Sequence, residues 1–473
     1  MSPSFSVKMQ ISDGLLQITR ATSLDEVYKT LRPSPLISQE ELDAFYRHEI
    51  NATRGGDKIK RLRLRLNRSA ADNIPFKACI MGHPGVGKST ELSRLLADTE
   101  KNFCAIRFSA TTALDPNNFR PLDVLLVMII EITERTGRLA GRPSDVLLKK
   151  VWQWFSIETK THQREANLEG NIGGGVGVQK DSLWNQVLGL FLEIKGELKF
   201  ASTRSTEVVE YRLRRLKDLI PIANELIREC NLLLRNTVGK EWLFIGEDFD
   251  KAGISNERIE ELFITYANLF NELKAHLIFN IPIGLYYSSG ATRLPFPPEC
   301  SLVIPDTQVC NSDNTEKESG CLALQSVLDA RMDIDLFEEG QVKRVTLASG
   351  GNLRDLFHIV NYAADTAILD GGSKISSEDV DEAIANLRSI YERRLGQNPY
   401  DAEEITYDAK ATRLVEIYGN NREAYMTDEI LYSLLLARAV QEFSRDSDGE
   451  RWFGIHPLVI DILVIQGRLV RSV

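Results

Sequence analysis

Short apolar runs alternate with helix-length amphipathic segments along much of the chain after residue 75. The runs are KACIM at 77–81, FCAIRF at 103–108, WLFIG at 242–246, HLIFNIPI at 275–282 and SLVIP at 301–305. Apolar runs of this length, separated by helical periodicity, are typical of parallel strands that helices cover on both faces. The pattern predicts an α/β fold with a five-stranded parallel sheet.

The second and third apolar runs are separated by residues 109–241, far more than a crossover helix needs. This interval contains helical patterns at 121–137 and 207–235, a glycine-rich stretch at 171–179 and an alternating stretch, FLEIKGELKF, at 191–200. We interpret the last two as an inserted β-ribbon or mobile flap, with a disordered loop as the alternative.

The pattern divides the chain into four regions. Residues 1–74 are an N-terminal extension for which the sequence indicates no role. Residues 75–309 are the sheet core, with an insert at about 138–240. A polar linker then leads into a helical lid at 310–400. Residues 401–473 contain a helix, two short strands around a polar turn and an apolar helix after Pro457, which is the outline of a winged helix.

Composition excludes several classes of protein. The 473 residues carry 57 basic and 67 acidic side chains, so the net charge of −10 disfavours a general attraction to nucleic acid. The six cysteines include no CxxC pair, and no apolar run approaches the length of a membrane helix. With no secretion signal at the N-terminus, we expect a cytoplasmic protein without a membrane partner. A basic stretch at 57–68 is interpreted as the solvated face of a helix, with DNA contact as the alternative.

The loop after the first apolar run, GHPGVGKST at 82–90, fits the pattern G-x-x-x-x-G-K-[ST]. Between a strand and a helix, such a loop surrounds a β-phosphate with backbone N–H groups at the positive end of the helix dipole. Lys88 is expected to reach the β- and γ-phosphates of ATP, and Ser89 to bind Mg²⁺. The expected nucleotide-binding residues are Gly82, Pro84, Gly85, Val86, Gly87, Lys88, Ser89 and Thr90.

Adjacent carboxylates end the third apolar run, in EWLFIGEDFDK at 241–251. An acid at this place in P-loop proteins holds Mg²⁺, and its neighbour can orient or deprotonate the attacking water. We therefore expect Glu247 to bind the metal and Asp248 to be the catalytic base. Asp250 leaves a second register open, in which Asp248 approaches the metal.

Two further polar residues are candidates for contact with the γ-phosphate. Asn280 falls in the fourth apolar run, at the expected end of its strand; the alternative is a buried asparagine that satisfies backbone groups. Arg354, in SGGNLRDLF at 349–357, falls in the first turn of a lid helix, where pairing with Asp355 or another acid is the alternative. A guanidinium that reaches from the lid to the γ-phosphate makes the lid position depend on the nucleotide.

The segments GHPGVGKSTEL, FIGEDFDK, FNIPIGL and SGGNLRDL, in this order, resemble the motifs of AAA+ and STAND-type P-loop ATPases, in particular bacterial ATPases of signalling and anti-phage defence. RWFGIHPLV resembles the end of their winged helix, and the resemblance covers roughly 75–470. It implies that Lys88 and Ser89 are the Walker A pair and that Glu247 and Asp248 are the Walker B pair. It also implies that Asn280 is the sensor-1 residue and Arg354 the sensor-2 arginine. Aspartate is more usual than glutamate at the place of Glu247. The longer side chain is expected to change the geometry of the metal site and hence the rate of ATP hydrolysis.

The resemblance implies an ATP- and Mg²⁺-dependent molecular switch that hydrolyses ATP slowly and acts as a homo-oligomer or on an effector protein. A neighbouring subunit commonly supplies an arginine finger in such ATPases, and Arg293 and Arg331 are the candidates here. Two alternatives stay open: a DNA loader or remodeller that uses the winged helix and residues 57–68, and a scaffold that binds nucleotide without hydrolysis. Nucleic acid is the less favoured partner, because the expected recognition helix carries only Arg438 as a base.

Overall fold

The computed structural model describes residues 19–166, 182–200, 206–251, 253–396, 405–444 and 450–471. Its centre is a five-stranded sheet in the order β2-β3-β4-β1-β5, and every neighbouring pair is parallel. The strands are β1 (Lys77–Met81), β2 (Phe103–Ser109), β3 (Glu241–Glu247), β4 (His276–Asn280) and β5 (Ser301–Val303). All five coincide with the apolar runs, so the predicted α/β fold with a parallel sheet is confirmed.

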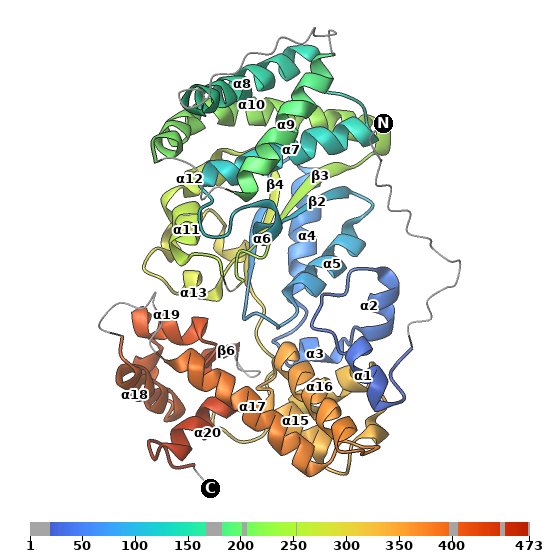
Figure 1. Cartoon of the computed structure of the whole chain (residues 1–473), viewed down its shortest axis with the longest axis vertical. Helices are drawn as coiled ribbons and strands as arrows, with labels where there is room; N and C mark the ends of the chain where they lie inside the picture. The colour runs from blue at the N-terminus through green and yellow to red at the C-terminus, as the bar shows by residue number, and fades with distance from the viewer. Residues whose placement is uncertain are drawn as a thin grey trace.

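Helices cover both faces of the sheet (Figure 1). Helices α4 (Lys58–Ala71) and α5 (Lys88–Thr99) cover one face with side chains that include Leu62, Leu66 and Leu92. The other face packs against the insert, where α7 (Pro121–Leu139) and α10 (Thr206–Val238) contact each other and β2 or β3. A short helix, α6 (Ala110–Ala113), follows β2.

The insert is helical where the structure describes it, and the prediction of a β-ribbon at 191–200 is wrong. These residues belong to α9 (Leu183–Lys199), which packs on α8 (Asp145–Ala166). Phe191, Ile194 and Leu198 are buried at spacings of three and four, whereas Leu192 is 73% exposed. This is the spacing of one helix face, which overrides the apparent alternation. The glycine-rich stretch at 171–179 lies outside the described residues.

Between β3 and β5 the chain forms α11 (Asn256–Glu260), a π-helical turn (Glu261–Thr265), α12 (Ala267–Glu272), α13 (Ile283–Tyr286) and two 3₁₀ turns (Ala291–Arg293 and Pro298–Cys300). The helices after the sheet are α14 (Glu318–Asp329), α15 (Gln341–Ala348), α16 (Leu353–Leu369) and α17 (Ser377–Leu395), with a 3₁₀ turn at Ile334–Leu336. These four helices form the predicted helical lid. No helix within the described ranges is both long and apolar enough to cross a membrane.

The C-terminal unit has the predicted order of helices and hairpin. It comprises α18 (Tyr407–Tyr418), a 3₁₀ turn (Arg422–Tyr425), α19 (Glu429–Leu436), the antiparallel strands β6 (Val440–Ser444) and β7 (Arg451–Ile455), and α20 (Pro457–Ile465). The unit contacts the lid through α20, which packs on α17 and α15, and contacts the core through α19 and α13. Part of the winged helix is therefore packed inside the molecule.

The N-terminal extension contributes to the core of the protein. It forms α1 (Leu24–Thr30), α2 (Gln39–Phe45) and α3 (Glu49–Ala52) before α4. Helix α1 packs on α16 and α3 on α14, so the extension joins the lid to the sheet core (Figure 1). Leu36 N–H also donates a hydrogen bond to Thr90 Oγ1, 3.2 Å away, at the start of α5.

Candidate functional site

The G-x-x-x-x-G-K-S motif forms the turn between β1 and α5, at the carboxyl end of the sheet where ligands of α/β proteins bind. Gly85 (φ +100°) and Gly87 (φ +97°) adopt left-handed backbone conformations, and Gly87 is the N-cap of α5. A Cβ on Gly85 would lie 2.4 Å from Asn352 Oδ1 and 2.6 Å from Arg354 Cβ. The lid therefore touches the phosphate-binding loop, and only glycine fits at the contact.

Lys88 lies inside this turn and is only 6% exposed. Its ammonium donates to the carbonyl oxygens of Gly82 at 2.7 Å and His83 at 2.9 Å, and pairs with Asp250 Oδ2 at 2.6 Å. Asp250 is thus the acid that holds Lys88, a contact that was not predicted from the sequence. A buried ammonium with one carboxylate partner is a suitable donor to a phosphate.

The two acids at the end of β3 have different partners. Glu247 is 9% exposed, and its Oε1 accepts a hydrogen bond from Arg107 Nε at 2.5 Å. Asp248 accepts from Ser109 Oγ at 2.5 Å and pairs with Lys251 at 3.0 Å. Asp248 also has a φ of 68°, which costs a non-glycine residue roughly 1–2 kcal/mol. Asp248 follows the last residue of β3 and lines the same cavity as Glu247.

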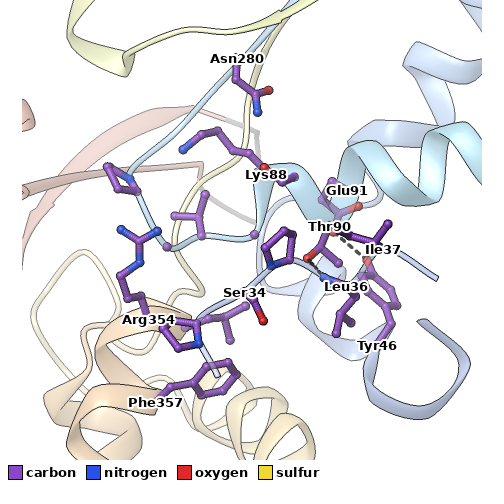
Figure 2. A pocket seen from close by; sticks show the side chains of 18 of the residues that line it. Ser34, Leu36, Ile37, Tyr46, Lys88, Thr90, Glu91, Asn280, Arg354 and Phe357 are labelled. Atoms are coloured by element: carbon purple, nitrogen blue, oxygen red, sulfur yellow. Dashed lines mark hydrogen bonds between the residues drawn. The ribbon is translucent and has the colours of Figure 1, made fainter. Parts of the chain in front are cut away.

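Asn280 and Arg354 face the same cavity from opposite sides, as Figure 2 shows. Asn280 is 2% exposed, and its Oδ1 has no hydrogen-bond partner among the described residues, so the side chain is not a satisfied core amide. The guanidinium of Arg354 makes no hydrogen bond or ion pair within the described ranges, and burial lowers its pKa. The alternative of a pair with Asp355 does not occur, because Asp355 binds Tyr391 and Arg438 instead.

The cavity measures about 510 Å³ and extends beyond the phosphate-binding loop. Its far wall is formed by the N-terminal strap, our name for residues 33–54, together with Val327 and Phe357 of the lid. Pro33, Leu36, Phe45 and Ile50 make this wall apolar. A cavity with charged groups at one end and apolar side chains at the other matches a nucleotide, with phosphates at Lys88 and the base against the strap.

Arg54 is a site residue that sequence reasoning missed. Its side chain lines the cavity and is 5% exposed, yet it makes no hydrogen bond or ion pair with any described residue. Burial lowers the pKa of the guanidinium, partly offset by the charges of Glu91 and Asp306. A buried, unpaired cation is costly, so this site favours an incoming acceptor. No sequence signal marks Arg54, because it falls between two helices in a turn without a recognisable motif.

Arg331 and Arg293 differ in their surroundings. Arg331 is 6% exposed, donates to the carbonyl oxygens of Phe45 and Val327 at 3.0 and 3.1 Å, and lies over the ring of Phe357. Burial lowers its pKa to about 10. Arg331 is therefore part of the cavity wall and does not reach a neighbouring subunit. Arg293 lies on an exposed 3₁₀ turn after β4.

A buried polar network connects the phosphate-binding loop to the lid. Asp306 accepts hydrogen bonds from His83 Nδ1 at 2.8 Å and Asn352 Nδ2 at 2.7 Å. Asn352 also donates to Pro84 O at 3.2 Å, and its Oδ1 caps α16 by accepting from the N–H groups of Arg354 and Asp355. These partners hold the pKa of Asp306 well below its usual range, against the effect of its burial.

The network continues from the lid into the C-terminal unit. Asp355 accepts from Tyr391 Oη at 2.6 Å and pairs with Arg438, which is 5% exposed. His456 stacks on Tyr391 with ring centroids 4.2 Å apart, and its Nε2 lies 3.1 Å from Ser349 O. Burial lowers the pKa of His456 to about 4, so the imidazole is neutral. The start of α16 is consequently held from both sides, by the phosphate-binding loop and by the C-terminal unit.

Comparison with known proteins gives only distant matches. No protein-family model matches the chain, and no curated protein matches it. Among solved structures, Cdc6p from Pyrobaculum aerophilum aligns with a TM-score of 0.37 and 12% identity over 94% of this chain and 99% of that chain. Drosophila ORC bound to DNA gives 0.39 and 11% over 98% and 96%, and the Thermotoga maritima RuvB Holliday junction branch migration motor gives 0.34 and 11% over 93% and 100%. Likenesses at these TM-scores assign no activity to this chain.

The donor set fits MgATP. Within the described residues no cluster of three or more His, Cys, Asp or Glu side chains is arranged to hold a metal ion. Mg²⁺ does not need one, because it usually binds through one or two protein oxygens, phosphates and water. Ser89 and Glu247 supply oxygens beside the phosphate-binding loop, and both line the cavity. The unpaired guanidinium groups of Arg354 and Arg54 are suited to a polyanion that carries its own metal ion, whereas the unpaired Oδ1 of Asn280 is an acceptor suited to a water molecule.

Proposed function

We propose that the protein is an ATP-binding and ATP-hydrolysing molecular switch, in which the nucleotide joins the sheet core to the helical lid. The observation that carries this proposal is the contact across the cavity. Lys88 and Asn280 of the core and Arg354 of the lid face one volume, and the lid meets the phosphate-binding loop at Gly85. A triphosphate between these groups draws the lid onto the core, and its loss removes that attraction.

Each residue of the proposed site has a role that follows from its position. Bound Mg²⁺ would neutralise charge on the phosphates and position them for attack by water. Ser89 and Glu247 hold the metal ion, and Lys88 leaves Asp250 to donate to the phosphates. Asp248 orients the attacking water and accepts its proton. Asn280 donates its amide N–H to the γ-phosphate or the same water.

The N-terminal strap completes the proposed site. Leu36 and Phe45 supply an apolar surface for the base, while Thr90 fixes the strap to α5 through the Leu36 N–H. Arg54, within the strap, supplies a third cation to the cavity. Adenine is the base that we propose, since ATP is the common substrate of such sites.

Slow turnover is part of the proposal because both acids are already engaged. Glu247 holds Arg107, and Asp248 holds Ser109 and Lys251, so metal and water have to displace these partners. Displacing the partner of Glu247, which is largely buried, is costly. Assembly with further copies or an effector protein is proposed from the family resemblance, with Arg293 as the arginine finger; the bacterial signalling or defence setting also stays a prediction.

A DNA-binding role receives less support from the contacts. Arg438, the base in the expected recognition helix, is buried against Asp355. On α4, Arg63 pairs with Asp98 and Arg65 with Glu299. These pairs reduce the positive charge available to phosphates. Steeply salt-dependent binding to duplex DNA, lost on charge reversal at residues 57–68, would restore the loader or remodeller as the better function.

Nucleotide binding and phosphate release by Lys88→Ala test the proposal. The variant is expected to lose both, whereas Lys101→Ala, at an exposed position beyond α5, retains both. Asp248→Asn is expected to bind ATP and to release no phosphate. Equal, negligible release from wild type and Asp248→Asn would favour the non-hydrolysing scaffold. Binding and hydrolysis unchanged in a folded Lys88→Ala variant would contradict the proposal.

A further inference from the structure

A second cavity of about 640 Å³ lies where the lid meets the C-terminal unit. Its walls come from α15 and α17 of the lid, from both strands of the hairpin and from α20. No residue that lines it also lines the nucleotide cavity. The volume is within the range of small-molecule sites.

The inner wall of this lid–hairpin cavity is apolar and aromatic. Leu347, Ile384 and Leu458 contribute aliphatic side chains, and Phe443 and Trp452 contribute neighbouring rings with centroids 4.9 Å apart. Phe443 and Trp452 face each other across the hairpin and are 6% and 4% exposed. Such a wall favours a flat apolar or aromatic group.

Two donor groups of the cavity lack partners among the described residues. Trp452 Nε1 is buried and has no hydrogen-bond partner in the described part of the chain. Arg388 of α17 lines the cavity and makes no hydrogen bond or ion pair with the described residues, although its charge lowers the pKa of Asp461 against the larger, opposing effect of burial.

The remaining charges of the rim are already paired. Arg344 pairs with Asp381, and Arg471 pairs with Asp461. With both carboxylates engaged, Arg388 is the charge left for a ligand. The charged side chains that line the cavity are three arginines and two aspartates, so one positive charge is in excess, and a ligand that brings a negative charge is complementary to it.

We propose that the lid–hairpin cavity is a second ligand site, which binds a small molecule with an aromatic or apolar body and one carboxylate, sulfonate or phosphate group. The ring system lies against Phe443 and Trp452, and the anionic group accepts from Arg388. The indole N–H of Trp452 donates to a second acceptor on the ligand.

A ligand bound at this site affects the nucleotide cavity through one short chain of contacts. This coupling between the two sites rests on the proposed function. Gln441 lines the lid–hairpin cavity, is 3% exposed, and donates to Gly350 O at 2.8 Å. Gly350 lies two residues before Asn352, the lid residue that holds the phosphate-binding loop. A ligand that moves the hairpin thus acts directly on the segment that connects lid and core.

Fluorescence titration with 8-anilino-1-naphthalenesulfonate, an aromatic anion, tests the site in the full-length protein. One saturable site is expected in the wild type, with affinity about tenfold weaker in Arg388→Gln, the value expected for loss of one charge-assisted hydrogen bond. Trp452→Phe, which keeps a ring and removes the donor, is expected to weaken binding severalfold. Arg142→Gln removes an exposed arginine of the insert and is expected to bind the probe as the wild type does.

Two results would overturn the proposal: no saturable binding, or unchanged affinity in a folded Arg388→Gln variant. The coupling has a separate readout, the affinity for fluorescent ADP with and without saturating probe. A change of threefold or more in the wild type, absent in Arg388→Gln, is expected. Since the probe titration contains no nucleotide, failure of nucleotide binding would count against the proposed function and leave the site standing.

Discussion

Replacement of Asn352 can distinguish two effects: loss of the contact between lid and core, and loss of stability within the lid. Asn352 is 1% exposed and has two distinct roles. Its Oδ1 caps α16, while its Nδ2 donates to Asp306 Oδ1 at 2.7 Å and to Pro84 O at 3.2 Å across the contact with the phosphate-binding loop.

The free energy lost with each role follows from the usual strengths of N-caps and hydrogen bonds. Loss of an N-cap costs about 1 kcal/mol, and loss of a hydrogen bond to a charged group costs about 1.5–3 kcal/mol. Asn352→Ala loses both and is expected to lower the free energy of unfolding by about 3 kcal/mol. Asn352→Asp keeps a capping oxygen but has no amide donor, and its carboxylate repels Asp306. Its penalty of about 2 kcal/mol falls on the contact between lid and core.

The assay pairs denaturant unfolding with the affinity for a fluorescent ATP analogue. Asn352→Asp is expected to bind the analogue at least tenfold more weakly, because the lid no longer closes over it in the same geometry. Ser376→Ala is the matched control, since Ser376 caps α17 of the same lid without contacting the phosphate-binding loop. It is expected to lose about 1 kcal/mol of stability with unchanged affinity. Full stability and wild-type affinity in Asn352→Asp would refute the reasoning.

Two more predictions concern buried groups. Arg54→Met removes an unpaired buried charge, so it is expected to raise the stability of the nucleotide-free protein by roughly 1–3 kcal/mol while weakening nucleotide affinity about tenfold; lower stability with unchanged affinity would contradict a ligand role. The pKa of His456 falls to about 4 in the fold, so its contribution to stability is present above about pH 6.5 and is lost as the pH falls toward 4. Between pH 7 and pH 5 this loss amounts to about 2 kcal/mol in denaturant unfolding, and it is expected to disappear in His456→Gln; an identical pH dependence in both proteins would show that His456 is not responsible.

The sequence predicted the sheet and the acids at its edge because both depend on local pattern. The three central strands are short apolar runs buried on both faces. Glu247 and Asn280 end two of them, and Lys88 lies at the end of the loop that follows the third. The carboxyl ends of parallel strands meet at one edge, so position in sequence was enough to bring these residues together.

What the sequence did not reveal depends on contacts between distant segments. Arg54 enters the cavity only because α3 packs on α14, more than 250 residues later. The register of the acids at the metal was ambiguous because Asp248 and Asp250 follow the strand in a turn, where periodicity no longer fixes direction. The pairing of Asp250 with Lys88 was not predicted. The helix at 191–200 was missed because short amphipathic segments satisfy both periods, and only the packing on α8 distinguishes them.

The central claim is that the terminal phosphate, not the nucleotide as a whole, attracts the lid through Arg354. Affinities of wild type and Arg354→Gln for a non-hydrolysable ATP analogue and for ADP test it most directly. We expect the variant to bind the triphosphate about ten- to a hundredfold more weakly and ADP nearly as well as the wild type, as loss of a charge-assisted hydrogen bond to the γ-phosphate requires. An equal loss for both nucleotides, or no loss for either, would contradict the account.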